Sequence, residues 1–162
     1  YRGLGEISII VTSGIMLPGM GYFVIMGRFD STFLIFSLPL SMYGLYFIIN
    51  VELPDMDSDI KGNKNTFVVR MGRKVSFAVL AITTASASTF FVLISYISII
   101  TIIDLKIVTT FSIIPLSAGI YSYYKQPVDN KNIIDLVTSN IAALIVFMII
   151  FNLFLFFSWT NI

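Results

Sequence analysis

Five long runs without charged residues set the fold of this chain before any other feature does. Each run has at least about 18 residues, the length that an α-helix needs to cross roughly 30 Å of hydrocarbon. A backbone in lipid must satisfy its own hydrogen bonds, so runs of this length predict helices. The sequence therefore predicts an all-α, polytopic transmembrane helical bundle. Its five spans are residues 7–27, 31–51, 75–103, 107–124 and 136–162.

The composition supports a membrane setting. Of the 162 residues, 57% are hydrophobic and 12% are charged, against about 45–50% apolar and about 25% charged residues in soluble domains. The run 75–103 is longer than a span requires and should tilt, kink or extend past the bilayer, whereas 107–124 is barely long enough. Neither an internal repeat nor a linker divides the chain, so we expect residues 1–162 to form a single transmembrane domain.

Basic residues are unevenly divided between the two ends of the predicted spans. When the five spans alternate in direction, eight basic residues fall at one end and two, Arg28 and Lys106, at the other. Short loops rich in Lys and Arg stay in the cytoplasm. The chain is therefore predicted to be an integral protein of the cell membrane, with the polar segment from Glu52 to Lys74 on the cytoplasmic side.

That polar segment is the only strongly polar stretch, with four carboxylates followed by five basic side chains. Asp55 and Asp59 are four residues apart and Glu52 lies three before Asp55, so on one helix they share a face. Pro54 is expected to end the membrane helix or to start a new one. A loop of solvated, mutually screened charges is the alternative interpretation.

The chemistry open to this segment is narrowed by what the chain lacks. There is no Cys and no His, which leaves carboxylate oxygens to bind a cation. Such ligands suit Mg²⁺, which commonly bridges a few carboxylates to phosphate oxygens. Lys64 and Arg70 follow the carboxylates and could complete an anion site. The order of acids, turn and bases therefore favours a cation-phosphate pair.

The polar segment also matches a known motif. Glu52-Leu-Pro-Asp-Met-Asp-Ser-Asp59, followed by Lys64-Asn-Thr-Phe-Val-Val-Arg-Met-Gly72, resembles the second aspartate-rich motif of the intramembrane prenyltransferases of the UbiA superfamily. Tyr1-Arg-Gly-Leu-Gly-Glu6 looks like a segment found midway along the quinone-type members, particularly the 1,4-dihydroxy-2-naphthoate polyprenyltransferases. The family has Gly before the motif Lys, where this chain has Asn63; Asn also tolerates left-handed backbone geometry, so the turn can survive.

The resemblance implies an architecture. Family members have nine spans, and the five here would be the fifth to the ninth. The first aspartate-rich motif of the family, Asn-Asp-x-x-Asp-x-x-x-Asp, does not occur in these residues and is expected upstream. We therefore expect the chain to be the C-terminal half of a longer prenyltransferase, with a naturally short or split protein as the alternative.

The resemblance also implies an activity, the Mg²⁺-dependent transfer of a polyprenyl group from an allylic diphosphate to an aromatic quinone precursor, as in menaquinone biosynthesis. Asp55 and Asp59 would be the catalytic metal ligands, and Lys64 and Arg70 would bind the diphosphate. Glu52 would be a further ligand or would orient one. Other acceptors in the family are 4-hydroxybenzoate and geranylgeranylglyceryl phosphate. From other classes, a membrane transporter and a non-catalytic cation-binding scaffold stay open.

Several further residues have a structural and a functional interpretation. Arg2 and Glu6 would line the acceptor site in quinone-type members or anchor the first span at the interface. The remaining features are interpreted as structural. They are an interfacial aromatic belt at Tyr121, Tyr123 and Tyr124, interhelical hydrogen bonds from Asn140, Asn152 and residues 83–89, and close packing or a kink at Gly14, Gly19 and Gly21 beside Pro18.

Overall fold

The computed structural model describes the backbone of residues 4–97 and 105–160, and the side chains of residues 5–96 and 106–157. Every regular element in these ranges is a helix, which confirms the predicted all-α fold. The elements are α1 (Leu4–Val11), the π-helical turn η1 (Thr12–Met16), α2 (Leu17–Met26), α3 (Ser31–Lys61), α4 (Phe67–Ile97), α5 (Leu105–Phe111), α6 (Ile113–Lys125) and α7 (Asn130–Thr160).

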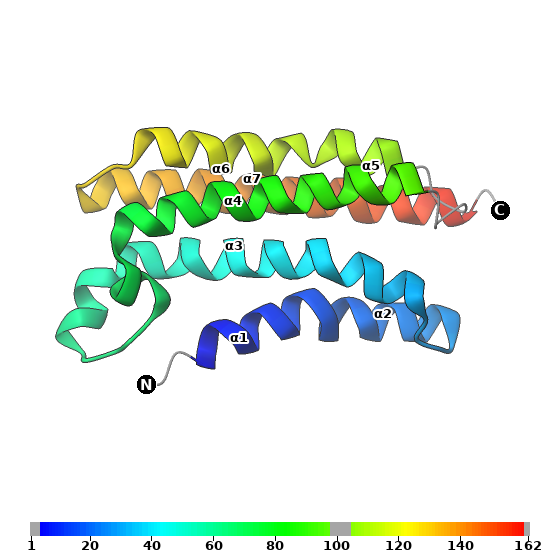
Figure 1. Cartoon of the computed structure of the whole chain (residues 1–162), viewed down its shortest axis with the longest axis horizontal. Coiled ribbons are helices and arrows are strands. Elements are labelled where there is room, and N and C mark those ends of the chain that lie inside the picture. The colour runs from blue at the N-terminus through cyan, green and yellow to red at the C-terminus, as the bar shows by residue number, and fades with distance from the viewer. Residues whose placement is uncertain (1–3, 98–104, 161–162) are drawn as a thin grey trace.

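The helices lie side by side along one axis, and the chain reverses direction at each end (Figure 1). The start of α1, the α3–α4 loop and the α6–α7 connection lie at one end, which we call the loop end. The α2–α3 turn lies at the other, the turn end. A core of large side chains joins α3, α4 and α7; for example, the rings of Tyr43 and Phe147 are 5.0 Å apart, and Phe91 also packs on Phe147.

Four helical stretches are long and apolar enough to cross a membrane, and the chain is an integral membrane protein. They are Gly5–Met26, Ser31–Lys61, Phe67–Tyr96 and Asn130–Phe157. The predicted span 107–124 differs, because it is divided at Ser112 into α5 and α6. Pro115 explains this break, since it cannot donate to the Phe111 carbonyl and its ring crowds that carbonyl. Residues 98–103 and 161–162 of the predicted spans lie outside the described residues.

Helix α3 is longer than the sequence predicted. It continues to Lys61, and Pro54 lies inside it, so the expectation that Pro54 would end the helix or start a new one was wrong. Tertiary contacts offset the lost hydrogen bond, because Leu53 is fully buried and the Glu52 carboxylate accepts a hydrogen bond from α4. One helix therefore presents all the carboxylates of the motif.

Polar side chains tie the helices together inside the bundle. Asn140 on α7 donates to Asn50 Oδ1 on α3 at 2.7 Å and to Ser122 Oγ on α6 at 2.8 Å, which confirms the predicted interhelical bonding for Asn140. Asn152 was predicted to do the same, but it is exposed and its amide donates to the Met148 carbonyl of its own helix. In residues 83–89, Ser88 bonds across to the Ser112 carbonyl.

The glycines of the first span have different surroundings. A Cβ at Gly14 would overlap the backbone of Ser41, and one at Gly19 would press on the Phe33 ring. The predicted close packing is therefore confirmed for these two. Gly21 faces open space, so it serves no contact between the described residues.

Candidate functional site

The turn after α3 is closed by a residue in the left-handed conformation. Asn63 has φ 52°, a conformation that Asn was expected to tolerate at this position. The Asn63 N–H donates to the Ile60 carbonyl at 3.2 Å, and the Lys64 N–H donates to the Asp59 carbonyl at 2.9 Å. This pair of bonds is the Schellman arrangement, which satisfies carbonyls that a helix end leaves without partners. It folds Lys64 back over the end of α3.

The folded-back turn brings Lys64 onto the second aspartate of the motif. Lys64 Nζ lies 2.9 Å from Asp59 Oδ1, and the Lys64 side chain is half exposed while Asp59 is buried. Asp55, one helical turn earlier, is exposed. The shared helix therefore presents one paired, buried carboxylate and one solvent-facing carboxylate.

The first turn of α4 is capped by three different elements. Thr66, which precedes the helix, accepts weakly from the Val69 N–H through its side chain at 3.5 Å. Glu52 Oε2 on α3 accepts from the Val68 N–H at 3.3 Å, and Glu6 Oε1 on α1 accepts from the Phe67 N–H at 2.7 Å. The first amides of a helix have no partner inside it, so each of these three is satisfied from outside.

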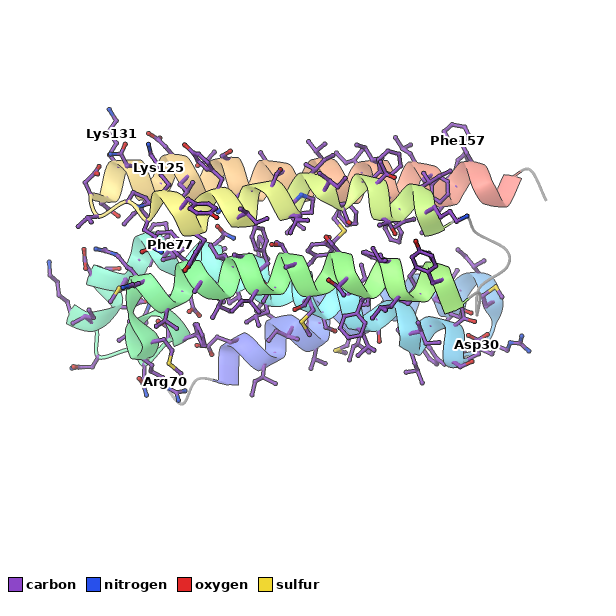
Figure 2. The ribbon with its side chains drawn as sticks, turned by 45° about the horizontal axis from the view of Figure 1, so that its top comes forward. Asp30, Arg70, Phe77, Lys125, Lys131 and Phe157 are labelled. Atoms are coloured by element: carbon purple, nitrogen blue, oxygen red, sulfur yellow. The ribbon has the colours of Figure 1, made fainter. Side chains whose placement is uncertain are left out.

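A second left-handed residue bends α4 soon after it starts. Gly72 has φ 80° and ψ 160°, a combination that is essentially restricted to glycine. Residues 67–71 therefore form a short arm that is set at an angle to the long part of α4 (Figure 1). Arg70 lies on this arm and is exposed at the loop end (Figure 2).

Arg73 joins three parts of the loop end. Its Nη2 atom lies 2.9 Å from Asp57 Oδ2 on α3, and its Nη1 donates to the Val128 carbonyl between α6 and α7 at 3.5 Å. Neither Arg73 nor Asp57 is among the site residues that the sequence predicts. A contact between residues 55 positions apart has no local signal that could have revealed it.

The sequence predicts that the loop carboxylates Asp55 and Asp59 hold Mg²⁺, and their surroundings show what they could offer to the ion. In the stretch of chain that the structure describes, no group of three acidic side chains is placed to hold a metal ion by itself. Two carboxylates with phosphate oxygens and waters are enough for Mg²⁺, because that ion usually keeps several waters. The donor chemistry of Asp55 and Asp59 fits such a shared site.

The predicted site residues thus fall into two groups. Asp59, Lys64 and Glu52 are brought together by the turn and the start of α4, whereas Asp55 and Arg70 face outward nearby. Glu6 joins the first group although it is 61 residues from its partner Phe67. Arg2 lies outside the described residues. Tyr121, Tyr123 and Tyr124 are exposed near the loop end, and their role as an interfacial belt stays a prediction.

The fold and the site together define a class of protein: a helical membrane protein with a loop of acidic and basic residues at one end. The model of the UbiA prenyltransferase family matches residues 1–134, so the chain belongs to that family and is a membrane prenyltransferase. This agrees with the resemblance of the loop motif. The likeness to the 1,4-dihydroxy-2-naphthoate members is not decided by the match. No match was found among curated proteins or among solved structures.

Proposed function

We propose that this protein transfers a polyprenyl group from an allylic diphosphate to an aromatic acceptor within the membrane, in a reaction that depends on Mg²⁺. One observation carries the proposal. In the α3–α4 loop of this family member, a left-handed turn places Lys64 on Asp59, while Asp55 faces outward. Cation ligands and an anion-binding side chain then lie within one helical turn of each other.

The metal would be held by the two aspartates. Asp55 offers an exposed carboxylate, and Asp59 offers an oxygen that is paired with Lys64. When bound, Mg²⁺ supplies charge neutralisation for the leaving diphosphate. The resemblance implies that a second aspartate-rich motif, outside these residues, shares the ion.

The diphosphate would be bound by the basic side chains of the same loop. Lys64 is half exposed and can exchange its contact with Asp59 for a phosphate oxygen, because an ammonium group is a compact charge on a flexible stem. Arg70 is exposed on the short arm of α4 and would reach further oxygens. Glu52 is engaged by the Val68 N–H, which favours its orienting role over direct ligation.

The protein would promote the reaction mainly by stabilising charge. The allylic carbon–oxygen bond breaks and its electron pair leaves with the diphosphate, beside Lys64. The aromatic carbon supplies the electron pair of the new carbon–carbon bond, and the ring regains aromaticity when the substituent on that carbon leaves without its bonding pair. Phe47 and Val51 are exposed at four-residue intervals before Asp55, so an apolar stripe for the prenyl chain leads to the loop.

We propose a quinone precursor of the 1,4-dihydroxy-2-naphthoate type as the acceptor, because the first residues of the chain resemble those members. The runner-up acceptors are 4-hydroxybenzoate and geranylgeranylglyceryl phosphate. The loop end would face the cytoplasm. Arg70, Lys125 and Lys131 gather at this end of the bundle (Figure 2), as the positive-inside rule requires of a cytoplasmic face.

A transporter or a cation-binding scaffold is the candidate from another class. A carrier would be expected to place charged groups near the middle of its spans, whereas here the motif carboxylates lie at the last turns of α3. This location favours an enzyme that meets a lipid substrate at the membrane surface.

The test is a prenyl-transfer assay on membranes that carry the full-length gene product. An allylic diphosphate is supplied with each of the three acceptors, with Mg²⁺ present or chelated. We expect Mg²⁺-dependent prenylation of the naphthoate acceptor. Transfer to another acceptor would correct the substrate, and well-expressed protein that prenylates none of them would favour the transporter or scaffold. Labelling of a cysteine introduced at Asn63 only from the outer side would reverse the orientation.

A further inference from the structure

Two buried carboxyl groups meet at the start of α4, and the motif roles account for only one of them. Glu6 on α1 and Glu52 on α3 each have about 7% of their surface exposed. They accept hydrogen bonds from the neighbouring amides of Phe67 and Val68, so both carboxyl groups lie at the first turn of α4. The remaining oxygen of Glu6, Oε2, is buried and has no hydrogen-bond partner.

This arrangement points to a cap and not to a ligand site. The described residues contain no set of three acidic groups placed to hold a metal, and Glu6 and Glu52 are each engaged by a backbone amide of α4. The N-terminus of a helix attracts anions through its free amides and its dipole. Here the two carboxyl groups already occupy the first two amides, so α4 is not free to bind the diphosphate at its N-terminus.

The cap is close along the chain to the α3–α4 loop that carries Lys64. Only two residues separate Phe67 from Lys64, and Val68 follows Phe67. Asp59, on the other side of the turn, is fixed to Lys64 by both backbone and side chain. Holding the two amides therefore holds one end of the five-residue connection between α3 and α4. The other end is fixed by the left-handed turn at Asn63.

We propose that Glu6 is a positioning residue: together with Glu52 it fixes the first turn of α4 and thereby the place of Lys64. The inference assigns Glu6 no contact with substrate, and its link to catalysis rests on the proposed function. Glutamine should replace Glu6 well. Its amide oxygen can accept from the Phe67 N–H in place of Glu6 Oε1.

The experiment compares Glu6→Gln, Glu6→Ala and Glu6→Asp in the full-length protein. Asp, which keeps the charge but is shorter, should fail to reach the Phe67 amide. The first readout is hydrogen exchange of the amides of residues 67–69 in detergent-solubilised protein. We expect exchange about tenfold faster in the Ala and Asp variants, because the hydrogen bond to the Phe67 amide is lost and the turn opens locally. The Gln variant should stay within about twofold of wild type by the same reasoning.

The second readout is the kinetics of prenyl transfer. Glu6→Ala should raise KM for the allylic diphosphate and leave KM for the acceptor unchanged, and Glu6→Gln should restore both. Asp135→Asn, an exposed carboxylate of α7, is the matched control and should change neither readout.

Three outcomes would overturn the inference: wild-type exchange in both the Ala and Asp variants, a Gln variant that exchanges as fast as Ala, or a raised acceptor KM with normal exchange. If the Ala variant does not fold, the Asp and Gln variants still give opposite expectations. If the wild-type protein transfers no prenyl group, the proposed function fails, but the exchange measurement still decides whether Glu6 caps α4.

Discussion

The two ends of α3 handle their charged groups in different ways. At the turn end, Asp30 caps the helix by accepting from the Phe33 N–H at 3.3 Å, and the Tyr22 hydroxyl donates to the same carboxylate at 2.7 Å. The Tyr22 hydrogen bond, together with the Phe33 amide and Arg28, holds the pKa of Asp30 below its ordinary value. Every one of these partners lies within eight residues of Asp30.

At the loop end, the partners come from the whole bundle. Glu6 from α1, Glu52 and Asp59 from α3, and Arg73 from α4 all meet within this end, and Arg73 reaches the α6–α7 connection. Asp55 remains exposed there. The comparison teaches that partners close in sequence are sufficient to close the turn at one end, whereas the loop end is held by contacts between distant segments while Asp55 stays exposed.

The largest expected effect is a difference in prenyl-transfer activity between variants at the loop end and a variant at the turn end. Asp55→Asn and Asp59→Asn should each lower prenyl transfer by at least about a hundredfold, since each removes charge stabilisation from the transition state. Membrane insertion should be unchanged. The matched control is Asp30→Asn at the turn end, which should transfer at the wild-type rate. Normal activity in both motif variants would remove the functional distinction between the ends.

The second prediction concerns the bend that only the loop end has. Gly72→Ala should lower stability by about 1–3 kcal/mol, because φ 80° and ψ 160° strain any other residue. Space is not the cause, since no atom lies within 4 Å of an added Cβ. Gly21→Ala, also in open space but with helical backbone, should be neutral or slightly stabilising. Thermal unfolding in detergent measures both; equal melting temperatures would show that the bend can relax.

The third prediction compares one left-handed residue from each end. Asn63 has φ 52° and Gly27 has φ 67°. Alanine at either position should cost about 1–2 kcal/mol of stability. Only Asn63→Ala should also impair prenyl transfer, through the displaced Lys64, and Asn63→Gly should restore it. If Gly27→Ala lowers turnover as much as Asn63→Ala, the effect on activity comes from general destabilisation.

The smallest expected effect compares two arginines. Arg73 bonds to Asp57 and to the Val128 carbonyl with a largely covered side chain, whereas Arg28 lies 3.6 Å from Asp30 with 72% of its side chain exposed. Arg73→Ala should cost about 1 kcal/mol, and Arg28→Ala should be nearly silent, as for exposed ion pairs in general. Unfolding curves of the two variants at low and high salt provide the measurement, and a larger loss for Arg28→Ala would reverse the comparison.

Much of the loop could be predicted because its geometry is local. The turn at Asn63 was expected to survive because Asn tolerates left-handed geometry, and the spacing of Asp55 and Asp59 follows from the helical repeat. Pro54 was misjudged because its penalty is also local, while the contacts of Leu53 and Glu52 that offset it are not. Glu6 could not have been placed at the start of α4, since no sequence pattern pairs it with Phe67.

The sequence by itself determined the membrane-spanning helices, their alternation, and the order of acids, turn and bases, because hydropathy, charge and turn chemistry act over a few residues at a time. The tertiary structure alone decided which carboxylates are buried, which amides they cap and which aspartate is left exposed. Those outcomes depend on α1, α3, α4 and the α6–α7 connection meeting at one end, and the free energy of such contacts exists only when distant segments are packed together.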